Sequence, residues 1–378
     1  MRESIVLSDG TSFEGTRFGS PTTVTGEVVL YTGVVGWQEV LTDPCYAGKI
    51  VVFTYPHVGN YGVNDEDVES SDVTVRGIVV RDLARFHSNF RAKGSFRAWV
   101  EERGIAGLDG VDTRAIMVHA RNQGIGTGAI ADSPEAGLRA LRETTSPFEW
   151  NLVAKVQGIC RWPAASGLRT EDSEPSLQSP PQSSALGPQS SALRLGVLDL
   201  GGKYSLYRQM AELGCALRYF PWNSSAELIA ASGVDGLLLP PGPGDPNRLG
   251  SIVEQVHRLV GKLPILGIGL GFQVLALALG GRVVRLKAGR HGVNYPVRST
   301  RGEPSMIVAC HHSFAVDGAS LPPGVDITYV HLNEGTAMGL EARGLRAWGY
   351  QFHPGWDGDN RPSPLLARFV ETLRTASA

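Results

Sequence analysis

The second half of the chain alternates continuously apolar runs with amphipathic runs, and this rhythm limits the folds that it can adopt. Starting near residue 194, the apolar runs LRLGVLDLG, CALRYFPW, GVDGLLLPPG and PILGIG alternate with KYSLYRQMAELG, SAELIAAS, SIVEQVHRLVG and FQVLALALGG. This α/β alternation is typical of a doubly wound parallel sheet. Ligands of such sheets bind beyond the carboxyl ends of the strands, where the sequence has two glycine-rich turns, PPGPGDP and GIGLG.

One run within this half also fits a membrane span. Residues 263–281 carry no charge and are long enough to cross a bilayer. Several glycines and Pro264 interrupt the run, however, and they suit a strand, a turn and a helix far better than one long helix. We therefore expect no membrane span.

The first 150 residues have a different character. SIVLSDGTSFEG predicts a hairpin around a D-G turn, and EVVLYTGVV and KIVVFTYPH predict further strands. FRAWVEERGI and VDTRAIMVHARNQG have helical spacing. We expect a β-rich N-terminal domain over 1–150, a connecting segment over 151–193, and the doubly wound domain over 194–378. Within the connecting segment, 163–193 is rich in Ser and Pro and predicts a flexible linker.

Composition excludes several classes of protein. The length of 378 residues predicts two domains, and the net charge of −2 gives no basis for binding nucleic acid or an anionic membrane. The four cysteines form no CxxC pair, which is typical of a reduced, cytoplasmic chain. The N-terminus MRESIVLSDG has no apolar core, so we expect no signal peptide.

The turn GIGLG has the frame on which α/β enzymes place a nucleophile, G-x-(Ser or Cys)-x-G, but its central residue is Gly269. Phe272 prevents a dinucleotide fingerprint, and no Lys follows to make a phosphate loop. Two interpretations remain open. Either a nucleophile has been lost at this position, or Gly269 is a plain turn residue that suits unusual backbone angles.

The order and spacing of GLLLPPGPGDP, GIGLGFQVLALALGG and QFHPG resemble a class I glutamine amidotransferase domain. LTDPCYAGKIVVFTYPHVGNYGVNDEDVESS, GIVVRDL, DTRAIMVHARNQG and LKAGRHGVNYPV resemble the small subunit of carbamoyl phosphate synthetase. The resemblance covers nearly the whole chain outside the linker. It implies a large-subunit partner that makes carbamoyl phosphate from bicarbonate, ATP and ammonia, in pyrimidine and arginine synthesis. It also implies that ATP and Mg²⁺ belong to that partner and that this chain carries no cofactor.

In the family that this chain resembles, a Cys, a His and a Glu release ammonia from glutamine. The resemblance places the Cys on Gly269 and the Glu on Gly355, while the His is kept as His353. The family's N-H-G-F reads HHSF here, and its T-D-P-S reads TDPC. The resemblance implies ligand contacts at Cys45, Gly242, Gly244, Leu270, Gln273, His311, Ser313 and Phe314.

A glycine cannot form a thioester, so we expect that the chain does not hydrolyse glutamine by the family mechanism. Two alternatives stay open. The first is new chemistry in the same pocket, because Cys45, Cys310, His311, His312 and His353 are expected to gather there and such residues bind zinc or supply a relocated nucleophile. Their spacing matches no metal motif, so we assign no metal site. The second alternative is a sensor that binds glutamine or a related ligand without turnover.

Two further groups near the motifs receive no firm role. We expect Asp357 and Asp359, which follow His353, to be solvated turn residues in GWDGDN, and the alternative is that they orient His353 in place of the missing Glu. Lys203 is expected to pair locally.

Overall fold

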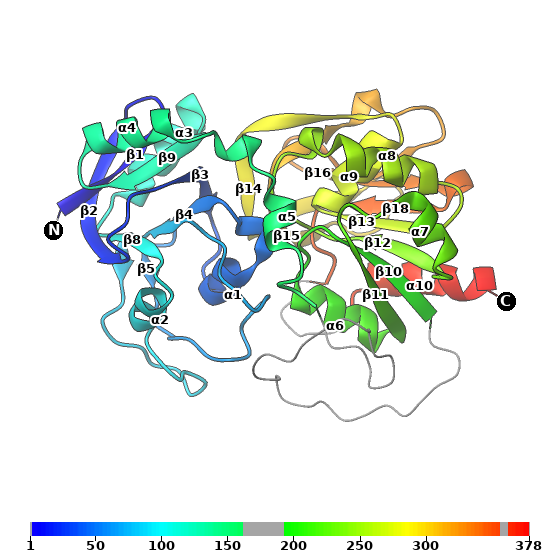
Figure 1. Cartoon of the computed structure of the whole chain (residues 1–378), viewed down its shortest axis with the longest axis horizontal. Coiled ribbons are helices and arrows are strands. Elements are labelled where there is room, and N and C mark those ends of the chain that lie inside the picture. The colour runs from blue at the N-terminus through cyan, green and yellow to red at the C-terminus, as the bar shows by residue number, and fades with distance from the viewer. Residues whose placement is uncertain (1, 162–192, 356–361, 378) are drawn as a thin grey trace.

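The computed structural model describes residues 2–161, 193–355 and 362–377. They form two lobes that lie side by side along the longest axis of the molecule (Figure 1). The predicted linker, 163–193, lies outside the described residues except for its last residue. Asp357 and Asp359 lie outside them as well.

The first lobe contains the N-terminal strands. Its strands are β1 (Arg2–Leu7), β2 (Ser12–Gly19), β3 (Val24–Tyr31), β4 (Lys49–Phe53), β5 (His57–Val58), β6 (Gly77–Val79), β7 (Asp82–Leu83), β8 (Ala106–Asp109) and β9 (Thr127–Ala131). Its helices are α1 (Trp37–Thr42), α2 (Phe96–Glu102), α3 (Thr113–Gln123) and α4 (Pro134–Glu143), with the short 3₁₀ helices η1 (Pro44–Tyr46) and η2 (Pro147–Glu149). Helix α5 (Leu152–Val156) lies between the lobes, and its Val153 packs in a core of the second lobe (Figure 1).

The N-terminal strands close into a barrel. β1 and β2 form the predicted hairpin, with Val6 opposite Ser12 across the D-G turn. The ring runs β3-β4-β6-β8-β2-β1-β9 and closes because β9 also pairs with β3. Alternate side chains of a strand face opposite sides, and both sides are buried here. Ile50 of β4 lies in one hydrophobic core, and its neighbour Val51 lies in another.

The second lobe contains the remaining elements. Its strands are β10 (Leu193–Asp199), β11 (Cys215–Pro221), β12 (Gly236–Leu239), β13 (Ile265–Ile268), β14 (Arg282–Ser299), β15 (Met306–Asp317), β16 (Asp326–His331), β17 (Ala337–Ala342) and β18 (Ala347–Tyr350). Its helices are α6 (Tyr204–Glu212), α7 (Ala226–Ala231), α8 (Gly250–Leu259), α9 (Leu270–Ala278) and α10 (Pro364–Ser377), with η3 (Pro246–Arg248), η4 (Gly318–Ser320) and η5 (Arg343–Leu345).

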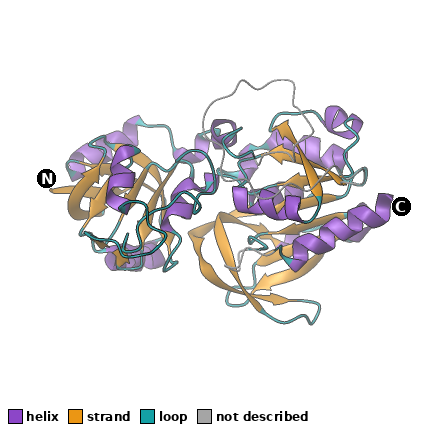
Figure 2. Ribbon diagram, turned by 90° about the horizontal axis from the view of Figure 1, so that it is seen from below, coloured by secondary structure: helices purple, strands orange, loops and turns teal. Residues whose placement is uncertain are grey.

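The second lobe is the doubly wound sheet that the sequence predicts. Strands β11-β10-β12-β13-β18 are parallel neighbours, and β17, β15 and β14 continue the sheet with antiparallel pairs. Helices α7, α8 and α9 bury their apolar residues in one core, whereas α6 and α10 bury theirs in a second core. Figure 2 shows the strands and the helices that pack on them. Within 263–281, residues 265–278 form β13, the turn at Gly269 and α9. No helix in the described part of the chain is long and apolar enough to cross a membrane.

The long β14–β15 hairpin was not predicted from the sequence. β14 contains Pro296 and two glycines, and its pairing with β15 is interrupted by register shifts between Arg285 and Arg290 and between Gly292 and Tyr295. Proline and glycine weaken the alternating pattern by which a strand is recognised. The sequence pattern of β14 therefore does not predict a strand, although the strand spans 18 residues.

This hairpin joins the two lobes. Tyr31 of β3 pairs with His291 of β14, so the barrel and the doubly wound sheet share one continuous sheet. Beside this junction, the Ser313 hydroxyl donates a hydrogen bond to Glu27 Oε1 at 2.5 Å, and the Lys49 ammonium is paired with the same carboxylate. These charged groups are buried, which ties the relative position of the lobes to specific side chains.

Candidate functional site

The turn between β13 and α9 consists of Gly269 alone. Its φ of 58° and ψ of −113° lie in a region that L side chains rarely adopt. Its N–H donates to the Tyr350 carbonyl at 2.9 Å, and its own carbonyl accepts from the Gln273 N–H at 3.2 Å. The backbone therefore has the sharp strand-to-helix turn that exposes a nucleophile in α/β enzymes.

Space at this turn does not demand a glycine at its centre. A Cβ on Gly269 would lie 3.3 Å from Pro241 Cβ and 3.5 Å from Pro241 Cα, a tight contact without a collision. A Cβ on Gly271 would instead collide with the Leu239 carbonyl oxygen, because helix and strand approach closely there. Packing therefore requires a glycine at position 271, whereas position 269 has room for a small side chain.

Two backbone segments converge on the turn. Leu270 provides the first N–H of α9, and first-turn N–H groups have no acceptor within their own helix. The loop after β12 carries Gly242 and Gly244, and its Pro241 is the residue that a Cβ on Gly269 would contact. Gly242, Gly244 and Leu270 are among the positions at which the family resemblance implies ligand contacts.

His353 follows β18 and is 6% exposed. Its N–H donates to the Ala309 carbonyl at 3.0 Å, and its ring lies edge-on to the ring of His311 with centroids 4.8 Å apart. Burial and the neighbouring charge of Lys203 hold the pKa of His353 well below its usual value. The imidazole is therefore neutral at pH 7. Gly269 has no side chain whose proton this imidazole could accept.

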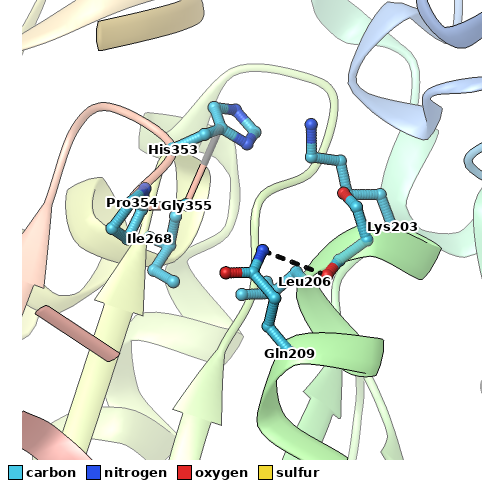
Figure 3. A pocket seen from close by; sticks show the side chains of 8 residues that line it. Lys203, Leu206, Gln209, Ile268, His353, Pro354 and Gly355 are labelled. Carbon is cyan, nitrogen blue, oxygen red and sulfur yellow. Dashed lines mark hydrogen bonds between the residues drawn. The ribbon is translucent and has the colours of Figure 1, made fainter. Parts of the chain in front are cut away.

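Gln209 of α6 fills the space beside Gly355. Gly355 has a φ of 120°, and a Cβ added to it would collide with the amide oxygen of Gln209. That oxygen accepts from the Ser363 N–H at 3.1 Å, and Gln209 Nε2 donates to the Ser205 carbonyl at 3.2 Å (Figure 3). The place next to the position predicted for a catalytic Glu is thus occupied by an anchored amide.

A cavity of about 20 Å³ remains between these groups. It has room for a molecule the size of water, whereas pockets for small-molecule ligands usually measure several hundred Å³. Figure 3 shows the imidazole of His353 and the ammonium of Lys203 at its upper end. The lining residues are Lys203, Ser205, Leu206, Gln209, Ile268, His353, Pro354 and Gly355.

Lys203 brings a buried positive charge to the cavity. Its Nζ lies 3.6 Å from Asp43 Oδ2 and 3.7 Å from Glu69 Oε1, and all three residues are less than 5% exposed. Burial alone would lower the pKa of Lys203, but Glu69 and Asp43 outweigh it and the pKa is raised. The lysine is therefore a cation held between two carboxylates of the first lobe.

Cys45 and His311 face this region from η1 and β15. The Cys45 N–H donates to Asp43 Oδ1 at 2.9 Å, and the next residue, Tyr46, places its hydroxyl 2.7 Å from His311 Nδ1. Burial raises the pKa of the Cys45 thiol well above its ordinary value, with a further contribution from Asp43. The thiol is thus protonated at neutral pH.

The other predicted residues have structural contacts. Gln273 Nε2 donates to the Phe314 carbonyl at 2.8 Å and to Gln351 Oε1 at 3.0 Å, and His312 Nδ1 donates to the same carbonyl at 2.8 Å. Cys310 is completely buried in a hydrophobic core, where burial raises the pKa of its thiol. The core that contains Cys310 also contains Leu206 and Ile268, which line the cavity, whereas Cys45 lies in a core of the first lobe.

Sequence reasoning missed several residues that line or brace this region. Lys203 and Gln209 line the cavity, Glu69 pairs with Lys203, and Tyr46 holds His311. Lys203 had a usable signal, because it follows the carboxyl end of β10, where ligands of doubly wound sheets bind. Glu69 and Tyr46 had none, since they come from the first lobe and reach the site only through the packing of the lobes. Among the described residues, no group of three His, Cys, Asp or Glu side chains is placed to hold a metal ion.

The match to known protein families first defines the class of this site. Residues 196–372 match the family model for class I glutamine amidotransferase, and residues 5–130 match the model for the carbamoyl-phosphate synthase small chain, CPSase domain. The second lobe is therefore a class I glutamine amidotransferase domain, joined to a small-chain N-terminal domain.

Full-length relatives narrow the assignment. The carbamoyl phosphate synthase small chain of Akkermansia muciniphila is 38% identical over 380 residues, covering 100% of this chain and 98% of the relative. The proteins of the same name from Caulobacter vibrioides and Aquifex aeolicus are 39% and 36% identical, each over 98% of this chain and 97% and 99% of the relative. The chain belongs to the carbamoyl phosphate synthase small chain family.

Proposed function

We propose that this chain is a carbamoyl phosphate synthase small subunit that has lost glutamine hydrolysis and that supports or regulates an ammonia-using large subunit. The observation that carries the proposal is Gly269, which has the backbone angles of a nucleophile turn but no side chain. Glutamine hydrolysis through a thioester needs a thiolate at that turn, because the carbonyl carbon of glutamine must bond to sulfur before ammonia leaves. Glycine offers no atom for this bond.

The groups around the turn support the same proposal. His353 is neutral and well placed by its contact with His311, but no thiol lies at position 269 to give it a proton. Gly355 supplies no carboxylate to orient the imidazole, and Gln209 fills the adjoining space. Loss of members of a catalytic triad lowers turnover on the order of a million-fold.

The two alternative roles of the pocket receive less support. Cys45 and Cys310 are both buried, and the raised pKa of each thiol leaves little thiolate for a relocated nucleophile. They also lie in different hydrophobic cores. The cavity beside His353 gives the glutamine sensor no support, because none of the positions at which the resemblance implies ligand contacts lines it.

The proposal assigns the ATP chemistry to a partner. The relatives are named small chains, so we infer that this chain pairs with a large subunit that forms carbamoyl phosphate from bicarbonate, ammonia and ATP with Mg²⁺. It further places the pair in the cytoplasm, in pyrimidine and arginine biosynthesis. The large subunit would take its nitrogen from free ammonia.

The test uses the full chain mixed with the large subunit from its own genome. Carbamoyl phosphate formation is followed with glutamine alone and then with ammonium alone as the nitrogen source. We expect product from ammonium and none from glutamine above the level of the large subunit by itself. A small chain that carries Cys at the turn, such as one from a relative, serves as the positive control for glutamine.

Each result discriminates between the roles. Product from glutamine overturns the loss of hydrolysis and makes Cys45→Ala the next variant to test. A chain that neither binds the large subunit nor alters its stability or ammonium-dependent rate overturns the supporting role. Thermal stabilisation of the isolated chain by glutamine, without turnover, would favour the sensor in its place.

A further inference from the structure

Two phenylalanines in the first lobe are almost fully exposed. Phe86 and Phe90, in the segment between β7 and α2, are 88% and 97% exposed. We define residues 84–94, ARFHSNFRAKG, as the aromatic loop. Each Phe side chain offers roughly 150–250 Å² of largely apolar surface that a partner could bury. Two such rings exposed almost completely within one short loop make the loop a candidate interaction site.

The aromatic loop is braced against the neighbouring acidic segment, so the two rings are held outward. Arg91 contacts Asp67 at 2.6 Å and Glu66 at 3.0 Å, and Lys93 pairs with Asp65. The backbone is fixed as well, because the N–H groups of Ser88 and Lys93 donate to carbonyls of residues 60 and 63 at 2.9 and 2.8 Å. A partner that binds a preformed loop avoids most of the entropy cost of ordering it.

The bracing segment also reaches the candidate site. Glu69, a few residues after the contacts with Arg91, accepts from the N–H of Ser205 at 2.9 Å and from its hydroxyl at 2.8 Å. Ser205 lines the cavity beside His353, and Glu69 lies 3.7 Å from Lys203 Nζ. Residues 65–69 therefore contact the aromatic loop on one side and the candidate site on the other.

From these observations we propose that the aromatic loop is a docking element for the large subunit, with Phe86 and Phe90 inserted into apolar pockets of that partner. This inference rests on the proposed function and identifies the surface of this chain that contacts the large subunit. Aromatic side chains are enriched at the centres of protein interfaces and dominate their binding energy. Arg85 stands beside Phe86 and forms no ion pair within the described part of the chain, so the pocket should carry an acidic rim.

The experiment measures the dissociation constant of the full chain for the large subunit from its own genome. The test variant is Phe86→Ser with Phe90→Ser, and both positions are so exposed that the fold should be unaffected. The matched control is Leu228→Ser, an apolar residue of α7 in the other lobe that is 54% exposed. We expect the double variant to bind at least about 100-fold more weakly and the control to bind within about twofold of the wild type.

A second variant tests the bracing. Asp67→Asn keeps both phenylalanines and removes a charge that holds Arg91, so we expect binding about tenfold weaker. Wild-type affinity in the double Phe variant overturns the inference, while a wild-type chain that does not bind at all overturns the proposed function instead. Self-association of the wild-type chain that is lost in the double variant would assign the loop to contacts between copies and would also overturn the inference.

Discussion

The amide oxygen of Gln209 lies within collision distance of the position that a Cβ of Gly355 would take. The same oxygen accepts a hydrogen bond from the Ser363 N–H, so the amide is anchored and not merely adjacent. A pocket that had lost a carboxylate without further change would leave buried polar groups unsatisfied, at a cost of about 1–3 kcal/mol each. Here the amide of Gln209 instead occupies the space next to Gly355 and has hydrogen-bond partners of its own.

This arrangement predicts that Gly355→Glu destabilises the protein. The new side chain would meet Gln209 and would take a φ of 120°, which together should cost about 2–4 kcal/mol in the free energy of unfolding. Gln209→Ala in the same chain removes the collision and should recover part of the loss. Urea unfolding measures both effects. Gly250→Ala is the control, because a Cβ there meets no atom within 4 Å, and equal stability of Gly355→Glu and this control would refute the packing argument.

Gly269→Cys is predicted to fold but not to hydrolyse glutamine. The Cβ fits beside Pro241, while the φ of 58° should cost about 1–2 kcal/mol of stability. The same domain carries a neutral His353, yet Gly355 supplies no carboxylate to orient that ring for the new thiol. Ammonia release from glutamine and alkylation of the thiol are the two measurements. Turnover near that of a small chain with an intact triad would show that the missing thiol was the sole defect.

The buried pair of Glu27 and Lys49 predicts a strong effect at the junction of the lobes. Lys49→Met leaves the Glu27 carboxylate buried with the Ser313 hydroxyl as its remaining close donor, and breaking a buried pair in this way costs about 3–5 kcal/mol. Adding Glu27→Gln removes the unpaired charge and should restore a large part of this loss. Unfolding free energies of the single and double variants form a cycle. A double variant that is as unstable as the sum of its parts would contradict the pairing.

The sequence predicted local structure well and long-range placement poorly. The alternation of apolar and amphipathic runs identified the strands and helices from β10 to α9, and the D-G turn identified the first hairpin, because both signals lie within a few residues. The β14–β15 hairpin escaped because Pro296 and the register shifts disturb its pattern.

In the candidate site, too, local features were predicted from the sequence and long-range contacts were not. The positions of Gly269, His353 and Gly355 came from motifs, which are local. Gln209 and Glu69 are brought to the cavity by a helix and by the other lobe, and a single sequence has no signal for such contacts.

The buried histidines predict that stability falls as the pH falls below about 6.5. Burial lowers the pKa of His312 from 6.5 to about 4, so the unfolded chain takes up its proton at a higher pH than the folded chain does. The stabilisation is complete above pH 6.5 and is lost as the pH approaches 4, which for this residue amounts to about 2 kcal/mol at pH 5. His311 and His353 act in the same direction, since the pKa of each is lowered by burial. Urea unfolding at pH 7.5 and pH 5 should show a smaller difference for His312→Asn than for the wild type, and an unchanged difference would mean that His312 is protonated in the folded protein.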